Sequence, residues 1–195
     1  MPNLCCFEMN VQGTKERVEN FIKVIKANYD YNSDTCECDY DRHLFRVFEA
    51  DVFSDTINES NIRTIEIVGQ CAWSVYSCMC EGGSTYYNDF KTEKGFKGTT
   101  LQKESALGLA IQVYSEESGC AFQEHFVYVN GETIAEECID WEENYIDNED
   151  DLAEYNKSHG TSYTMQYIEE HDNSLPEGGF ENQEFKDYSV ELLSA

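Results

Sequence analysis

Three neighbouring residues carry the side chains that nucleophilic catalysis requires. Cys120 is followed closely by Glu124 and His125, so a thiol, a carboxylate and an imidazole lie near one another in the chain. A thiol beside a base is the usual arrangement of a cysteine nucleophile. If this segment is a strand, however, Glu124 and His125 point to opposite faces of the sheet. We therefore expect no catalytic residues and keep a Cys/His-dependent small hydrolase only as the less favoured alternative.

Cysteine spacing offers a second kind of site, a zinc centre. The pairs Cys36/Cys38 and Cys78/Cys80 would supply four thiolates if the fold brought them together. Structural zinc sites usually place longer spacers between paired cysteines. We instead interpret Cys5, Cys71, Cys120 and Cys138 as buried free thiols that pack as small apolar side chains. The odd number of nine cysteines and the lack of a secretion signal pattern in residues 1–13 argue against a disulfide framework. We expect no metal and no cofactor.

Acidic side chains dominate the chemistry of the chain. Asp and Glu number 39 against 13 Lys and Arg, which gives a net charge of −26. Residues 115–195 hold 22 of the acidic residues and only two Lys. A field of this sign repels phosphates and anionic lipids, so we expect no direct binding to nucleic acid or to a membrane. Partners that are themselves basic are favoured.

The candidate partner-binding residues are carboxylates interleaved with tyrosines. If residues 147–159 form a helix, four of the carboxylates share one face. Like charges on one face repel one another, and solubility alone would not require them to be clustered. Tyrosines add rigid contact area of the kind found in interfaces. The full set is Glu132, Glu136, Glu137, Asp140, Glu142, Glu143, Tyr145, Asp147, Asp150, Asp151, Glu154 and Tyr155. We interpret it as a surface for a partner rich in Arg and Lys; the alternative is a merely solvated acidic face.

The elements that position these residues follow from hydrophobic periodicity. Residues 4–12 alternate between apolar and polar side chains, as in a half-buried strand, and residues 14–28 repeat apolar side chains at helical spacing. Thr99 and Gln102 form a weak capping box before a second helical stretch. The remaining expected elements are strands at 44–53 and 62–69 joined by 55–60, a helix at 100–108 and a strand at 109–114. This β-α-β-β-α-β order predicts a ferredoxin-like split β-α-β antiparallel sheet of the α+β class.

A hairpin and an acidic extension complete the predicted fold. Asn130-Gly131 is a strong two-residue turn signal between strands at 121–129 and 132–141, which would extend the sheet. The chain then divides into a domain at 1–142 and an acidic, helical or irregular C-terminal extension at 143–195. Its aromatic residues, among them Phe185 and Tyr188, predict that part of the extension docks on the domain.

Several short blocks resemble the YubB-type ferredoxin-like domain of phage, plasmid and mobile-element proteins. They are Met1-Pro2-Asn3 before a strand ending in Val11-x-Gly13, the block Gly69–Val75 (GQCAWSV), the block Tyr114–His125 (YSEESGCAFQEH), and Asn130-Gly131-Glu132 leading to Glu137-Cys138. The resemblance covers about residues 1–142. It implies a ferredoxin-like fold and a mobile-element context, and it transfers no catalytic residues.

These observations lead to a functional expectation. Mobile elements often carry small acidic inhibitors of host defence, and that association points to a non-enzymatic inhibitor of a nucleic-acid-binding defence complex, of the anti-CRISPR or anti-restriction type. It would act in the host cytosol by blocking a basic nucleic-acid channel. The alternative outside this class is an interaction module of a conjugative element with a protein partner.

Overall fold

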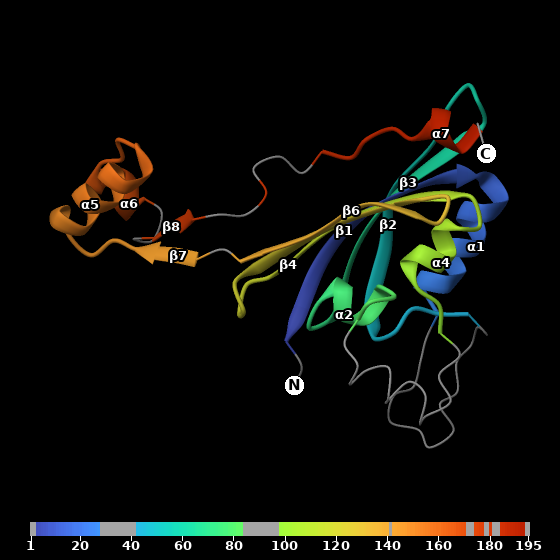
Figure 1. Cartoon of the computed structure of the whole chain (residues 1–195), viewed down its shortest axis with the longest axis horizontal. Coiled ribbons are helices and arrows are strands. Elements are labelled where there is room, and N and C mark those ends of the chain that lie inside the picture. Colours follow the sequence, from blue (N-terminus) through green and yellow to red (C-terminus); the bar gives the residue numbers. More distant parts are fainter. Residues whose placement is uncertain are drawn as a thin grey trace, which may run out of the picture.

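The structure is built around one open antiparallel sheet. The computed structural model describes residues 3–27, 42–83, 98–140, 142–170, 174–177, 180 and 184–193. Figure 1 shows the six-stranded sheet, whose strand order is β2-β3-β1-β4-β5-β6. Its strands are β1 (Leu4–Thr14), β2 (Val47–Ile57), β3 (Ile62–Ala72), β4 (Leu109–Glu117), β5 (Phe122–Val129) and β6 (Glu132–Asp140). The predicted α+β class with an antiparallel sheet is confirmed.

Strand β1 lies at the centre of the sheet and shows the predicted alternation. It pairs antiparallel with β3 on one side and with β4 on the other. Cys5, Phe7, Met9 and Val11 are buried, as period-2 alternation requires of the face turned toward the helices. The core continues from this face through the apolar residues of the neighbouring strands and of three helices.

Those helices are α1 (Lys15–Ile25), α2 (Val75–Met79) and α4 (Leu101–Ser105). Helix α1 begins directly after Thr14, its N-cap, and ends before residue 28. It buries Val18, Phe21, Val24 and Ile25, whereas Ile22 is only half-buried. Helix α4 is shorter than predicted, and its cap is Thr100, whose hydroxyl accepts the Lys103 N–H, rather than Thr99. None of the helices in the described ranges has the length and apolar character of a membrane span.

The β2–β3 hairpin corrects two predicted boundaries. Strand β2 begins at Val47 rather than at residue 44, and it continues to Ile57, into the segment 55–60 that we expected to be the connection. The turn lies at 58–61, where the Asn58 side chain accepts the Ile62 N–H and Asn61 adopts a φ of 64°. Asp55 remains in the strand because its carboxylate pairs with Arg63 on β3 at 2.7 Å.

The β5–β6 hairpin confirms the turn prediction. Asn130 and Gly131 have φ values of 50° and 87°, the two positive values that a type I′ turn needs. Val129 and Glu132 face each other across this turn, and β6 extends the sheet as its edge strand.

A second group of elements follows β6, and we name it the acidic unit (residues 142–170 and 174–177). It contains β7 (Glu142–Tyr145), α5 (Glu149–His159), α6 (Met165–Glu169) and β8 (Ser174–Glu177), with β7 paired to β8. Ile146, Leu152 and Ile168 form a small core of its own. Figure 1 shows α5 and α6 beyond the end of β6. The predicted helix is confirmed, but it begins after Asn148, so Asp147 precedes it.

The C-terminal strap (residues 184–193) returns to the sheet and ends in α7 (Ser189–Leu193). It lies on the sheet face opposite the helices, where Tyr188 packs against Ala110, Val127 and Val129 (Figure 1). Tyr188 is thus an aromatic residue of the C-terminal segment that contacts the sheet.

Candidate binding surface

The carboxylates of α5 form the most concentrated part of the predicted surface. Asn148 caps the helix by accepting the N–H groups of Asp150 and Asp151 at 2.9 and 3.0 Å. Asp150, Asp151 and Glu154 are exposed, as is Asp147 before the helix. None of them pairs with a Lys or Arg among the residues that the structure describes. Acidic residues in a first helical turn interact favourably with the helix dipole, although their mutual repulsion offsets part of that gain.

The predicted residues of β6 do not form one face. Glu136 lies opposite Phe126 and lies 3.5 Å from the hydroxyl of Tyr128, on the helix side of the sheet. Glu137 lies on the other side, where its carboxylate contacts His125 Nδ1 at 2.9 Å. Glu132, Glu136 and Glu137 are all exposed. Because neighbouring residues of a strand point to opposite faces, this edge offers negative charge to both sides of the sheet.

Of the remaining predicted residues, the structure describes the side chain of Tyr155 only. Tyr155 is half-buried and packs against the small core of the acidic unit, with its ring 6.3 Å from that of Tyr163. Its ring therefore helps to pack α5 against that core, and only part of it is exposed to a partner. Asp140 lies in β6, and Glu142, Glu143 and Tyr145 lie in β7; their side chains lie outside the described part of the structure.

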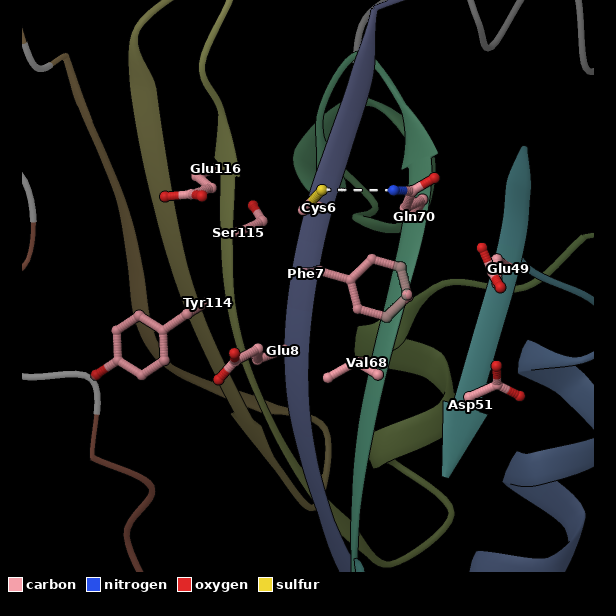
Figure 2. Close-up of a pocket in the computed structure, with 11 residues that line it drawn as sticks. Cys6, Phe7, Glu8, Glu49, Asp51, Val68, Gln70, Tyr114, Ser115 and Glu116 are labelled. Carbon is pink, nitrogen blue, oxygen red and sulfur yellow. Dashed lines mark hydrogen bonds between the residues drawn. The ribbon is translucent and has the colours of Figure 1, made fainter. Parts of the chain in front are cut away.

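A second acidic feature was missed by the sequence analysis. A hollow of about 420 Å³, which we name the acidic hollow, lies on the open face of the sheet. Figure 2 shows the side chains that line it. Its lining residues are Cys6, Phe7, Glu8, Glu49, Asp51, Val68, Gly69, Gln70, Tyr114, Ser115 and Glu116. Strand register builds it from two rows that cross β2, β3, β1 and β4. One row is Glu49, Gln70, Cys6 and Glu116, and the other is Asp51, Val68, Glu8 and Tyr114.

The chemistry of the acidic hollow favours a cation with an apolar stem. Asp51 pairs with Lys26 at 3.5 Å, whereas Glu8, Glu49 and Glu116 pair with no Lys or Arg in the described ranges. Val68 is exposed between them and provides an apolar floor. Lys and Arg side chains place their methylene groups on such surfaces and their charged ends among carboxylates.

The sheet separates His125 from Cys120 and Glu124. Cys120 and Glu124 line a cleft of about 320 Å³ beside Trp73 and Ser74, and His125 is not among the described lining residues. His125 lies on the open face, where its ring stacks on Tyr114 at 4.2 Å. The arrangement therefore lacks the thiol–imidazole contact that a Cys/His nucleophile uses.

The Cys120 thiol is also poorly suited to be a nucleophile. Its hydrogen bond with Glu117 raises the thiol pKa and lowers the pKa of Glu117. Asn3 Nδ2 donates to Cys120 Sγ at 3.2 Å. A thiol whose pKa is raised stays protonated at neutral pH, and only the thiolate is strongly nucleophilic.

The surroundings of Glu124 indicate that its carboxyl group stabilises the fold. It is 2% exposed and accepts the Val75 N–H at 2.8 Å, the Tyr76 N–H and the Ser115 hydroxyl at 2.7 Å. Burial raises the pKa of Glu124, and these hydrogen bonds offset part of that effect. The carboxyl group thereby joins β4 and β5 to the start of α2.

The cysteines only partly follow the prediction of buried thiols. Cys5 and Cys71 are fully buried, and hydrogen bonds with Cys5 and Cys78, together with burial, raise the pKa of Cys71. For Cys120 and Cys138 the prediction is wrong, because both are exposed, one in the turn before β5 and the other on the edge strand β6.

The cysteines considered for zinc give no metal site in the described ranges. Cys78 donates to the Ala72 carbonyl at 2.8 Å, and Cys80 accepts from the Tyr128 hydroxyl at 3.2 Å. Cys36 and Cys38 lie outside the described residues. Within the described ranges, no group of three or more His, Cys, Asp or Glu side chains is arranged to hold a metal ion.

Comparisons with known proteins assign neither a family nor a function. A scan against protein-family models gave no match, and searches of curated proteins and of solved structures found no similar protein. The resemblance to YubB-type domains therefore stays a prediction from sequence motifs.

Proposed function

We propose that this protein is a non-enzymatic inhibitor that binds the basic nucleic-acid channel of a host defence complex, such as a CRISPR effector or a restriction enzyme. The observation that carries the proposal is the set of exposed carboxylates on α5, which have no Lys or Arg partner in the described ranges. A basic channel supplies the missing partners, and complementary charge increases both the association rate and the selectivity of binding.

Two further features support the proposal. The acidic hollow is shaped for Lys or Arg side chains, which line nucleic-acid channels. The strand order β2-β3-β1-β4, with α1 between β1 and β2 and α4 between β3 and β4, is compatible with the ferredoxin-like arrangement that the sequence motifs imply. On this reading the protein belongs to a mobile genetic element and acts in the host cytosol, and β5–β6 and the acidic extension are additions to the ferredoxin-like sheet.

The test is inhibition of DNA cleavage by a panel of purified CRISPR effectors and restriction enzymes. The informative variant combines Asp150→Asn, Asp151→Asn and Glu154→Gln. A matched control combines Glu16→Gln, Glu59→Gln and Glu81→Gln, which changes the net charge equally at exposed positions away from α5. We expect the α5 variant to lose about tenfold in affinity for the inhibited enzyme, equivalent to about 1.4 kcal/mol, and the control to lose far less.

Salt and competition complete the design. Binding should weaken as salt rises, because ions screen exposed charges, and guide or target nucleic acid should compete for the same channel. A third variant, Glu8→Gln with Glu49→Gln and Glu116→Gln, reports whether the acidic hollow belongs to the same interface. Equal inhibition by the α5 and control variants, or binding that ignores salt, would overturn the proposal. Recovery of element-encoded proteins in a pull-down, without inhibition of any nuclease, would favour a conjugative interaction module.

A further inference from the structure

The contact between the C-terminal strap and the sheet is made by side chains that bind peptide backbone. Gln112 accepts the Lys186 N–H at 2.9 Å and donates to the Lys186 carbonyl at 2.6 Å. Gln12 accepts the Tyr188 N–H at 2.8 Å and donates to the same Lys186 carbonyl at 3.1 Å. Two amide side chains thus reproduce the alternating donors and acceptors of a strand edge.

These amides are held in place for that task. Gln12 is 4% exposed and Gln112 is 2% exposed, so neither has free access to water. Gln12 also donates to Asn10 Oδ1 at 3.1 Å, which fixes the orientation of its amide. With the strap in place these amides are buried and their hydrogen-bonding groups are satisfied by its backbone, so an extended peptide on the face of β1 and β4 is matched by fixed donors and acceptors.

The same face contains positions for two aromatic side chains. Tyr188 is 6% exposed and packs in an apolar cluster with Ala110, Val127 and Val129. Phe185, three residues earlier, lies with its ring 5.7 Å from that of Tyr114. Backbone contacts accept any extended chain, whereas these two positions select aromatic residues at this spacing.

The strap is bound to the sheet without being part of its hydrogen-bonded ladder. Its later polar contacts run from Asn58 to the Ser189 hydroxyl at 3.0 Å and from Asn130 to the Glu191 carbonyl at 3.5 Å, and half-buried Leu192 packs against the same apolar cluster as Tyr188. Val190 is 73% exposed. Segments with few buried apolar contacts open locally at a lower free energy than the sheet beneath them.

We propose that the open face of β1 and β4 is a peptide-binding site for an extended Phe-x-x-Tyr segment, occupied in the free protein by residues 185–188 of the chain itself. The strap is its internal ligand and exchanges with the same segment supplied by a second molecule. This inference does not depend on the proposed inhibitor function.

The test uses the full chain and a fluorescent synthetic peptide of residues 184–193. The variant Tyr188→Ala weakens the internal ligand and leaves the sheet face unchanged. Anisotropy titrations should show the peptide binding to this variant at least about tenfold more tightly than to the wild type, whose site is filled. Adding Gln112→Ala to the variant should remove this binding, and a control peptide carrying Tyr188→Ala should not bind.

Hydrogen exchange of the wild-type protein gives an independent decision. The amides of Lys186 and Tyr188 should exchange faster than those of β1 and β4, because the strap opens without unfolding of the sheet. Exchange of the strap amides at the same rate as those of β1 and β4 would mean that the strap is an integral part of the fold. That result, or equal peptide affinity for the wild type and Tyr188→Ala, would overturn the proposal. In the case that Tyr188→Ala does not fold, the exchange measurement on the wild type alone tests the proposal.

Discussion

Glu124 is a carboxyl group placed in the interior, where its hydrogen bonds hold three elements together. Its carboxylate oxygens accept hydrogen bonds from two backbone N–H groups at the start of α2 and from the Ser115 hydroxyl of β4. Because burial favours the neutral form, the folded protein binds a proton at Glu124 more readily than the unfolded chain does. Stability and pH are therefore linked through this one residue.

The substitution Glu124→Gln tests this linkage. Glutamine resembles the protonated carboxyl group but does not titrate. A raised pKa in the folded state gives a stabilising contribution that is complete below the unfolded pKa of about 4.3 and is lost as the pH rises through the folded pKa. We expect the unfolding free energy of the wild type, relative to Glu124→Gln, to decrease as the pH rises from about 4 to about 7.

Urea unfolding at a series of pH values measures this difference. Groups present in both proteins cancel, including Asp55, whose hydrogen bond with Arg63 lowers its pKa and acts in the opposite direction. A difference that is constant over the whole range would show that Glu124 has the same pKa in the folded and unfolded states.

Helix α5 shows how one capping residue supports a set of repelling charges. Its acidic first turn gains from the helix dipole, while the neighbouring carboxylates repel one another. The Asn148 side chain accepts two N–H groups and donates to Asp151 at 2.7 Å, so it binds backbone and carboxylate together. The placement of the α5 surface depends on this cap.

We expect Asn148→Ala to destabilise the acidic unit by about 1 kcal/mol, because the cap bonds are lost and the repulsion remains. The variant Asn148→Ser, which retains a capping oxygen, should lose much less. Hydrogen exchange of the amides in α5 reports this local change, with the amides of β1 as an internal reference. Equal exchange in the two variants would mean that packing of Leu152 and Ile168, rather than the cap, determines where the helix begins.

The elements that local sequence determines were predicted well, and those that depend on partners far along the chain were not. Alternation in β1 and the Asn130-Gly131 turn are local signals, so they predicted their elements. Asp55 resembles a loop residue until Arg63 of the next strand pairs with it. The acidic hollow depends on strand order, since Glu8 and Glu116 become neighbours of Cys6 only through pairing across separate strands. The strap depends in the same way on Gln12 and Gln112.

At the scale of the whole molecule, repulsion between like charges opposes the compact state. The net charge is −26, and the carboxylates concentrate on β6, the acidic unit and the acidic hollow. Self-repulsion of this kind keeps a protein soluble and lowers its stability. Added salt reduces that penalty, because screening shortens the distance over which the charges act.

We therefore expect the thermal midpoint to rise with sodium chloride as the Debye length falls from about 30 Å at roughly 0.01 M to about 3 Å at roughly 1 M. The variant with Asp150→Asn, Asp151→Asn and Glu154→Gln should show a smaller rise, since it has fewer charges to screen. Differential scanning calorimetry measures both. A midpoint that falls with salt would indicate that ion pairs such as Asp55–Arg63 dominate over repulsion.

The central position of β1 has a consequence for how the chain acquires its structure during synthesis. Both partners of β1 follow it in the sequence, and β4 ends only at Glu117. During synthesis β1 therefore emerges before either of its partners, and it is paired on both sides only after β4 has emerged. Pairings between such distant segments slow folding, because a long loop must close before they form. After β3 has paired with one edge of β1, the other edge stays open until β4 emerges, and an unpaired strand edge of this kind is a surface on which another chain can pair.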